Sequence, residues 1–578
     1  MKLTENKSEL IWQKILREKV HSGFIIPWKE KNKEEEFKNV INDTLYTLNE
    51  LKGSKEEGKS FLGKSNCCIS NYREINKVKR NANIPEKSSS IEEVIKSASK
   101  YFDSMFNWVH PKSMVNVAPP AAIPSIAGSL MGAIFNPNIV EQEYSGNIAA
   151  LEIEVAAIIS KLVGYDYKKA TGHFTFGGTG AYLFATKLAL TKLLGKESRK
   201  NGIRSDAQIL VSNVGHYAMK NCSDWTGLGT NNVRNINLNE DSSMDLNHLE
   251  EVMEQCYKEG KPIAMIVATM GTTDAFAVDN IKGIVEICDR FVRKHNLKKR
   301  PFIYADAVIG WAWSVFNSYD FKKNSMEFSE KTLRSIEKSV ANIRNLNLAD
   351  AIGIDFHKTG FTCYNCSMIC IKDCNDIDML TRDKDQMAYL YHSSAYTPGE
   401  YTLECSRGGG YALSAWCNLQ YFGLEGYRVI LGNLIECEMS LRNVIKEEPN
   451  LVCVNEKDNG LVTLFRVYPD KLKENINKVN FAEEQYKNEF TNPDYKEQLK
   501  KYNEYQNKIA NELERMMFEE NGPALSFTSK FRLSQYGEPI AAIKAYPMSP
   551  YMNFSEERLK EDIIKYVLRA KENVDKKL

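Results

Sequence analysis

Two periods of apolar and polar residues alternate along the middle of the chain. Between residues of roughly 150 and 375, short continuous apolar runs alternate with stretches in which apolar residues recur every three or four positions. The first pattern is typical of buried strands and the second of amphipathic helices. The expected strands are residues 209–211, 264–268, 302–306, 351–354 and 367–371, and the expected helices are residues 181–194, 246–257 and 281–291. This order favours an α/β fold in which a mainly parallel sheet is covered by helices.

The flanking regions differ from the middle in composition. Residues 1–115 are polar, rich in Lys and Glu and mostly helical in period, whereas the end of the chain combines strand patterns such as residues 461–465 with a charged helical stretch at residues 471–514. We therefore expect an N-terminal helical segment (1–115), a large domain (116–430) and a smaller α+β C-terminal domain (431–578). Residues 118–135 contain three prolines and two glycines, which predicts a buried loop and short helix rather than a membrane span.

Charge and cysteine content exclude several classes of protein. The 578 residues include 76 Lys and Arg against 75 Asp and Glu, so no net field attracts nucleic acid or an anionic membrane. Residues 1–7 lack the apolar core of a signal peptide. The thirteen cysteines are an odd number scattered through strand and helix patterns, which indicates reduced thiols. We therefore predict a cytoplasmic protein with neither nucleic-acid nor membrane partners.

The candidate chemistry begins with a carboxylate and a lysine. Asp306 ends one expected strand, and Lys358 follows the next one along the chain. Pyridoxal 5'-phosphate (PLP) needs this pair, because a lysine holds its aldehyde covalently and a carboxylate keeps its pyridine nitrogen protonated.

Three further motifs stand at the ends of expected strands or the start of a helix. Gly178, Thr179 and Gly180 open the helix at 181–194, where free backbone N–H groups favour a phosphate. His216 follows the strand at 209–211, and Thr273 follows the strand at 264–268. Ordinary turn and capping chemistry would explain each motif by itself. Their succession along one sheet favours a single cofactor site.

A cluster of cysteines invites a metal-site interpretation. Cys363, Cys366, Cys370 and Cys374 lie close together in the sequence, but Cys370 falls inside a strand pattern and no partner cluster follows. We expect buried structural thiols and no metal.

The order of these motifs resembles the group II PLP-dependent amino-acid decarboxylases of fold type I. The similarity rests on Gly-Gly-Thr-Gly-Ala at 177–181, Asn-Val-Gly-His at 213–216, Gly-Thr-Thr at 271–273, Ala-Asp-Ala at 305–307 and His-Lys at 357–358. It is strongest to the bacterial tyrosine decarboxylases, which share Gly-His-Phe-Thr at 172–175 and Glu-Cys-Ser-Arg-Gly-Gly at 404–409. The chain departs from the family at Phe356, where the family has proline, and at residues 143–147 near the expected substrate pocket.

The resemblance implies a role for each matched residue. Lys358 would bind PLP covalently, Asp306 would pair with the ring nitrogen, and His216 would stack on the ring. The other implied cofactor contacts are Ala307 under the ring, His357 beside the phosphate, Thr273 at the cofactor, and Gly178, Thr179 and Gly180 around the phosphate. The resemblance also implies a mainly parallel sheet of seven strands covered by helices, and a homodimer with a shared active site, in which the N-terminal segment wraps the partner.

The remaining expectations concern the substrate and the proton donor. We expect decarboxylation of an aromatic L-amino acid such as tyrosine, phenylalanine or tryptophan, with a substrate pocket that includes Trp108, Ala118, Pro119, Ser145 and Asn147. Alternatives are a decarboxylase of an acidic or diamino substrate (glutamate, aspartate, cysteine sulfinate, diaminobutyrate), or a fold-type-I aminotransferase or carbon–carbon lyase. The proton donor is expected in the loop 385–404, with Tyr396 as first candidate and His392 as second.

Overall fold

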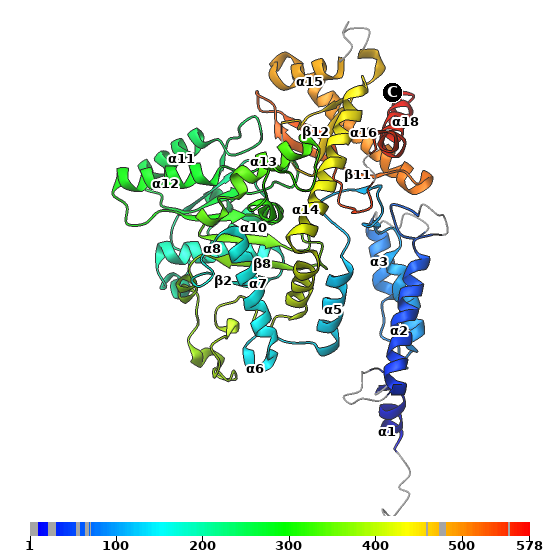
Figure 1. Cartoon of the computed structure of the whole chain (residues 1–578), viewed down its shortest axis with the longest axis vertical. Helices are drawn as coiled ribbons and strands as arrows, with labels where there is room; N and C mark the ends of the chain where they lie inside the picture. Colours follow the sequence, from blue (N-terminus) through cyan, green and yellow to red (C-terminus); the bar gives the residue numbers. More distant parts are fainter. Residues whose placement is uncertain are drawn as a thin grey trace, which may run out of the picture.

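The computed structural model describes residues 10–20, 23, 31–53, 58–63, 69, 71–457, 460–472, 481–552 and 555–577. Figure 1 shows three parts: an arm of N-terminal helices, a large α/β domain, and a C-terminal part that lies above it in this view. Residues 1–7, on which the expected absence of a signal peptide depends, lie outside the described residues.

Seven strands form the central sheet, in the order β2-β8-β7-β6-β5-β3-β4. They are β2 (Thr171–Thr175), β3 (Gln208–Ser212), β4 (Val233–Ile236), β5 (Ile263–Thr269), β6 (Phe302–Asp306), β7 (Ala351–Asp355) and β8 (Ser367–Ile371). The pairings that join β4, β3, β5, β6 and β7 are parallel, whereas β8 is antiparallel to both of its neighbours. The predicted mainly parallel, seven-stranded sheet is therefore confirmed.

Helices cover both faces of this sheet, because its strands are apolar on both sides. In β6, Ile303 and Ala305 belong to one core cluster, whereas Phe302 and Tyr304 belong to another. The first cluster includes α7 (Ile148–Val163), α11 (Leu246–Lys258), α12 (Ile281–His295) and α13 (Glu330–Ile343); the second includes α8 (Gly178–Leu194) and α10 (Ala218–Trp225). Two short helices, α6 (Gln142–Ser145) and α9 (Ser198–Asn201), also lie in this domain.

The direction of the strands brings the predicted motifs together. Adjacent parallel strands β7, β6, β5 and β3 end at the same edge, and β2 points the same way because it and β7 are both antiparallel to β8. The glycine turn after β2 and the segments that follow the other four strands therefore meet at the carboxyl edge of the sheet, where open α/β sheets bind ligands.

The C-terminal part has its own sheet, in the order β1-β11-β12-β10-β9. Its strands are β1 (Ser113–Met114), β9 (Leu451–Cys453), β10 (Thr463–Val467), β11 (Ala524–Leu533) and β12 (Pro539–Ala545), and its helices are α15 (Phe481–Thr491), α16 (Lys496–Glu520), α17 (Glu556–Leu559) and α18 (Lys565–Asp575). The α+β character matches the prediction, although β10 starts two residues later than expected. Residues 473–480 of the charged stretch lie outside the described residues.

One long helix joins the two domains. α14 (Gly410–Glu447) runs across the expected domain boundary at residue 430, and Figure 1 shows it extending from the large domain into the C-terminal part. Gly423 interrupts it with φ 55° and ψ −166°, a conformation that favours glycine.

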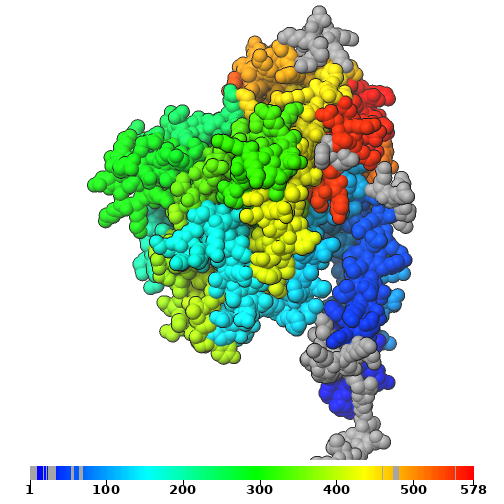
Figure 2. All heavy atoms as spheres, in the orientation of Figure 1, coloured from blue at the N-terminus to red at the C-terminus, as the bar shows by residue number. Residues whose placement is uncertain are grey.

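The N-terminal helices form an arm that projects from the rest of the molecule (Figures 1 and 2). They are α1 (Ile11–Ile15), α2 (Lys31–Glu50), α3 (Tyr72–Asn81) and α4 (Ile91–Ser99). The largely helical N-terminal segment is thus confirmed within the described residues.

The expectation that residues 118–135 are buried is wrong for the helix they contain. In α5 (Ile123–Phe135), Ile123 is 82% exposed and Phe135 is 84% exposed. The buried face consists of small residues, and a Cβ added to Gly132 would lie only 2.4 Å from the Cα of Gly410. The glycines let α5 pack closely on α14, so its larger apolar side chains point outward. None of the helices within the described ranges combines the length and apolar character needed to span a bilayer.

Candidate active site

Lys358 lies in a buried polar cluster just after β7. Its Nζ is 2.9 Å from Oδ2 of Asp355, and Oδ1 of Asp355 accepts a hydrogen bond of 2.6 Å from the Ser367 hydroxyl. His357 Nε2 is 3.6 Å from the same carboxylate. Although burial alone would raise it, Lys358 and His357 lower the pKa of Asp355. Burial by itself would lower the pKa of Lys358, but the nearby Asp355 carboxylate outweighs burial and raises that pKa. The lysine is therefore held as an ammonium ion at the sheet edge.

Asp306 is the last residue of the neighbouring strand β6 and is 3% exposed. Its Oδ2 accepts a hydrogen bond of 2.6 Å from the hydroxyl of Tyr182 on α8. Burial raises the pKa of Asp306, and Tyr182, Lys358 and His216 oppose that shift. A buried carboxylate with nearby positive charge is suited to pair with a cationic ring nitrogen.

The glycine turn lies between β2 and α8. Gly177 has φ 98°, which favours glycine, and Gly178 and Thr179 begin the helix with N–H groups that have no acceptor within it. A Cβ on Gly178 would lie 3.0 Å from the Asp355 carboxylate, which places this turn beside the lysine cluster. Gly180 is buried against Phe176, so its lack of a side chain serves packing. The turn thus offers an anion site next to Lys358.

His216 and Thr273 stand on the other side of Asp306. The His216 ring stacks on Tyr217 with 4.4 Å between ring centroids, and its Nδ1 accepts the N–H of Ala218. Burial lowers the pKa of His216, and the charges of Asp306 and Lys358 also act on it. Both His216 and Thr273 line the cleft described next.

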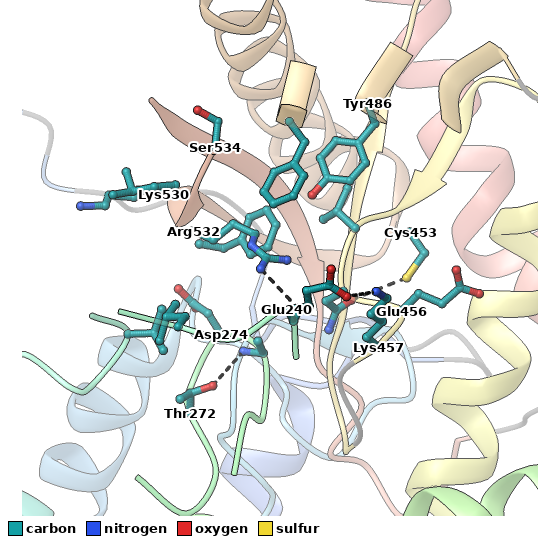
Figure 3. Close-up of a pocket in the computed structure, with 18 of the residues that line it drawn as sticks. Glu240, Thr272, Asp274, Cys453, Glu456, Lys457, Tyr486, Lys530, Arg532 and Ser534 are labelled. Atoms are coloured by element: carbon teal, nitrogen blue, oxygen red, sulfur yellow. Dashed lines mark hydrogen bonds and ion pairs between the residues drawn. The ribbon is translucent and has the colours of Figure 1, made fainter. Parts of the chain in front are cut away.

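A cleft of about 1450 Å³ separates the carboxyl edge of the sheet from the C-terminal domain. Residues after β3 and β5 form one wall, and β9, β11, β12 and α15 contribute to the other (Figure 3). In this cleft Lys544 of β12 forms an ion pair of 2.9 Å with Asp274, which follows Thr273. The Lys544 side chain is only 6% exposed. Aromatic residues of the C-terminal wall are Tyr486, Phe490 and Phe531.

The residues at this edge fit PLP. Asp306 offers an acceptor to a ring nitrogen, Lys358 offers an amine, and the turn at Gly178 offers N–H groups to a phosphate. Among the described residues, the buried hydroxyls of Ser212 and Thr269, at the ends of β3 and β5, have no hydrogen-bond partner within the chain. Such orphaned groups at a ligand-binding edge are expected where a polar molecule completes the site.

The structure also places the remaining predicted cofactor contacts. Ala307 is fully buried and donates its N–H to the carbonyl of Gly353 on β7. His357 is held by the backbone of Cys366, and its ring lies 4.3 Å from that of Tyr364. Phe356, which replaces the family's proline, is fully buried and packs edge-on against Trp311 with centroids 5.2 Å apart. Phe356 therefore fills the core beneath the loop that carries Lys358.

The five predicted substrate-pocket residues do not line this cleft within the described chain. Trp108 is half-buried and packs against Phe106, with ring centroids 5.2 Å apart. Ala118 is half-buried and Pro119 is buried. Ser145 donates its hydroxyl to the Glu141 carbonyl, and Asn147 is the exposed residue before α7. From the same segment as Ala118, Asn116 is the residue that reaches the cleft.

Both candidate proton donors are held by residues other than those around Lys358. The Tyr396 hydroxyl donates to Glu152 at 2.7 Å, and Glu152 forms a buried ion pair with Arg407. His392 is held by Glu400 at 2.9 Å and by the carbonyl of Met387 at 3.0 Å. In this conformation the loop is anchored to α7.

The cysteine cluster is only partly buried, which corrects the expectation. Cys366 and Cys370 are buried, but Cys363 is half-exposed and Cys374 is exposed at a short helical turn after β8. Within the described chain, no group of three or more His, Cys, Asp or Glu side chains is arranged to hold a metal ion.

Three residues of the site were not assigned by the sequence analysis. Tyr182 falls within the expected helix at 181–194, Asp355 directly follows the expected strand at 351–354, and Lys544 lies in a C-terminal strand, β12. A polar residue at the end of an apolar strand was a signal for Asp355. Residue spacing carried no such signal for the other two, because their partners are more than 120 residues away.

Comparison with known proteins identifies a family and several relatives. The model of the pyridoxal-dependent decarboxylase conserved domain matches residues 74–467. An L-2,4-diaminobutyrate decarboxylase of Acinetobacter baumannii is 24% identical over 377 residues, 62% of this chain and 68% of the relative. An L-tyrosine decarboxylase of Enterococcus faecium is 27% identical over 275 residues, 44% of this chain and 43% of the relative.

The fold has close counterparts among solved structures. The apo form of mouse CSAD superimposes with a TM-score of 0.73 at 17% identity, covering 93% of this chain and 99% of that one. This confirms the predicted fold class, and the family match confirms PLP as the cofactor. Because the family model spans more than half of its residues, the chain belongs to the pyridoxal-dependent decarboxylase family.

Proposed function

We propose that the protein decarboxylates an L-amino acid to the corresponding amine and CO₂. The observation that carries this proposal is the position of Asp306 at the end of β6 and of Lys358 just after the adjacent parallel strand β7, beside the glycine turn at Gly178. When bound, PLP supplies an aldehyde that condenses with an amine and a pyridinium ring that accepts the electron pair of a breaking Cα bond.

The chain's own residues then have separate tasks. Lys358 Nζ attaches the cofactor, and Asp306 accepts the ring N–H and so keeps the ring cationic. The N–H groups of Gly178 and Thr179 bind the phosphate, and the His216 ring covers one face of the site. Asp355 holds the lysine ammonium ion at 2.9 Å and so orients Nζ. His357, Ala307, Gly180 and Thr273 complete the proposed contacts.

The first alternatives are an aminotransferase and a carbon–carbon lyase of the same fold type. They differ in which bond at Cα breaks, so the products decide. Incubation of the purified protein and PLP with individual amino acids should release CO₂ and amine in equal amounts. Keto-acid formation without CO₂ would identify an aminotransferase, and aldehyde formation without CO₂ would identify a lyase.

Two substrate classes have support in the cleft. The aromatic class is favoured by the rings of Tyr217, Tyr486 and Phe490 on its walls. The acidic or diamino class is favoured by the ion pair between Lys544 and Asp274, because a charged substrate group can replace one partner.

Replacing Lys544 with Met separates these classes. For acidic substrates, kcat/KM should fall about 10- to 100-fold, since a charge-assisted hydrogen bond is lost. For diamino substrates it should rise, because Asp274 becomes available, and for aromatic substrates it should stay the same. Lys530→Met is the matched control, since Lys530 lies in the same cleft but is exposed. Equal kcat/KM values for wild type and Lys544→Met on every charged substrate would show that the Lys544–Asp274 pair does not take part in substrate recognition.

We also infer that the protein is a homodimer. The exposed apolar residues of α5 begin next to the lysine loop, where the Ala122 N–H donates to the Phe361 carbonyl. An apolar face at this position fits a second copy of the chain, and the projecting arm could reach that copy (Figure 2).

Sedimentation should give a mass of twice 65.9 kDa. Deletion of residues 1–100 or the substitution Ile126→Glu should yield monomers with little activity, because either change removes contact area or places a charge in an apolar interface. Leu193→Glu on α8 makes the same change elsewhere and should leave the mass unchanged. An active wild-type monomer would contradict the inference.

Tyr396 remains the proposed proton donor, which requires its hydroxyl to leave Glu152 when the loop closes over substrate. In Tyr396→Phe, CO₂ release should continue while amine formation slows. The unprotonated carbon should then be oxidised by O₂, which is reduced to H₂O₂, and hydrolysis should release the aldehyde and ammonia. Tyr391→Phe, in the same loop, should behave as wild type. Measuring CO₂, amine and aldehyde together decides the matter, and a wild-type rate of amine formation would transfer the role to His392 or another group.

A further inference from the structure

We propose that Tyr182 is a positioning residue for the cofactor-binding carboxylate: its hydroxyl fixes one oxygen of Asp306 and leaves the other for the ring N–H of PLP. The inference rests on the proposed function only in assigning Asp306 to the ring nitrogen.

The fold places this pair at a defined position. Tyr182 lies at the start of α8, four residues after the phosphate-binding Gly178, and Asp306 ends β6 beneath it. Tyr182 is 2% exposed and Asp306 is 3% exposed. The helix that would bind the cofactor phosphate therefore also carries the donor to the ring-binding carboxylate.

The two carboxylate oxygens have different surroundings. Oδ2 accepts the Tyr182 hydroxyl at 2.6 Å, whereas the donor closest to Oδ1 is the backbone N–H of Val308 at 3.5 Å. A contact of 3.5 Å is at the outer limit of a hydrogen bond. Oδ1 thus keeps the capacity to accept a ring N–H, and the hydrogen bond to Oδ2 prevents the carboxylate from rotating.

Charge reinforces the geometry. Burial favours the neutral form of Asp306, and a hydrogen bond donated to the carboxylate favours the ionised form. Burial and Asp306 raise the pKa of Tyr182 well above its usual value, so the phenol remains a donor throughout the physiological range. Without this hydroxyl, more of the shared proton would move from the ring nitrogen to Asp306.

The chain contains a matched comparison residue. Tyr304 is fully buried on β6, two residues before Asp306 and therefore on the same face of the sheet. Its ring lies 4.9 Å from that of Tyr182. Its hydroxyl has no partner in the described chain and occupies space left by Gly353, where an added Cβ would lie 2.0 Å away. Tyr304→Phe therefore removes an equally buried hydroxyl that does not bond to Asp306.

The test measures cofactor affinity rather than turnover. Apo-protein is titrated with PLP and with the analogue in which the ring nitrogen is replaced by C–H. Tyr182→Phe should weaken PLP binding about 10- to 100-fold, as expected for losing a hydrogen bond to a charged group, but should leave analogue binding within about twofold. Tyr304→Phe should change neither affinity.

A double-mutant cycle tests whether the effect passes through Asp306. In the Asp306→Asn background, Tyr182→Phe should cause no further loss of PLP affinity. The proposal is overturned if Tyr182→Phe weakens PLP and analogue equally, if Tyr304→Phe has the same effect, or if the losses add in the cycle. If Tyr182→Phe does not fold, 3-fluorotyrosine at position 182 serves instead, since it keeps the shape and is a stronger donor. It should tighten binding of PLP but not of the analogue, and equal changes for both would overturn the proposal.

These binding measurements are independent of the reaction catalysed. A protein that binds PLP with the predicted pattern but releases no CO₂ would retain the inference about Tyr182 and remove the proposed decarboxylase function. The opposite result would retain the decarboxylase function and assign Tyr182 to packing.

Discussion

Lys358→Ala should abolish covalent attachment of PLP and reduce turnover by at least about 10⁴-fold, which corresponds to about 5.5 kcal/mol of transition-state free energy. At the carboxyl edge of the sheet, Asp355 holds the Lys358 amine, and the glycine turn also lies beside the Asp355 carboxylate. Without Nζ, the described residues offer no other amine beside Asp355 that could exchange with the substrate's amine. Reduction with borohydride followed by peptide mass analysis should therefore show a cofactor-modified Lys358 in the wild type and no modification in the variant.

Lys372→Ala is the matched control, because Lys372 is an exposed lysine directly after β8. The Lys372→Ala protein should keep the visible absorbance of the covalently bound cofactor, the cofactor-modified Lys358 peptide and the wild-type rate. A borohydride-stable cofactor adduct in the Lys358→Ala protein would mean that another amine binds the aldehyde, and the assignment of the site would then be wrong.

The positions of several central strands were predictable because they depend on local patterns. Strands covered on both faces require continuous apolar runs, so β5 and β6 were recognisable from residues 264–268 and 302–306. Parallel neighbours end at one edge, so the sequence pattern alone predicts that Asp306 and Lys358 lie near each other.

The contacts of long range were not predictable in the same way. Tyr182 appeared as one more residue of an apolar helix, and its partner Asp306 is 124 positions away. The exposure of α5 depends on the close approach of Gly128 and Gly132 to α14, which a hydropathy pattern does not record. Likewise, the composition of the loop 385–404 did not reveal that the Tyr396 hydroxyl bonds to Glu152. Each of these features is a tertiary contact that overrides the local pattern.

Asp306→Asn should bind PLP yet lose about 10³- to 10⁴-fold in kcat, with each tenfold loss equal to about 1.4 kcal/mol. The amide keeps the shape of the side chain and can still accept the Tyr182 hydroxyl, so the site should remain assembled. A neutral group no longer stabilises a cationic ring, however, and the ring then accepts the electrons of the breaking Cα bond less readily. Because this loss arises in the transition state, KM should change little while kcat falls.

The control for this substitution is another buried aspartate of the same domain. Asp279 is 1% exposed and accepts the N–H groups of Met244 and Thr269, each at 2.7 Å. Burial raises the pKa of Asp279 to about 7, so part of the Asp279 population is already neutral at pH 7 and an uncharged substitute is a small electrostatic change there. Asp279→Asn should lower the melting temperature and leave kcat near the wild-type value. Asp306→Asn should lower kcat and leave the melting temperature near the wild-type value. A rate within tenfold of wild type in Asp306→Asn would show that the ring's charge does not limit catalysis, and the electron-accepting role assigned to this carboxylate would have to be abandoned.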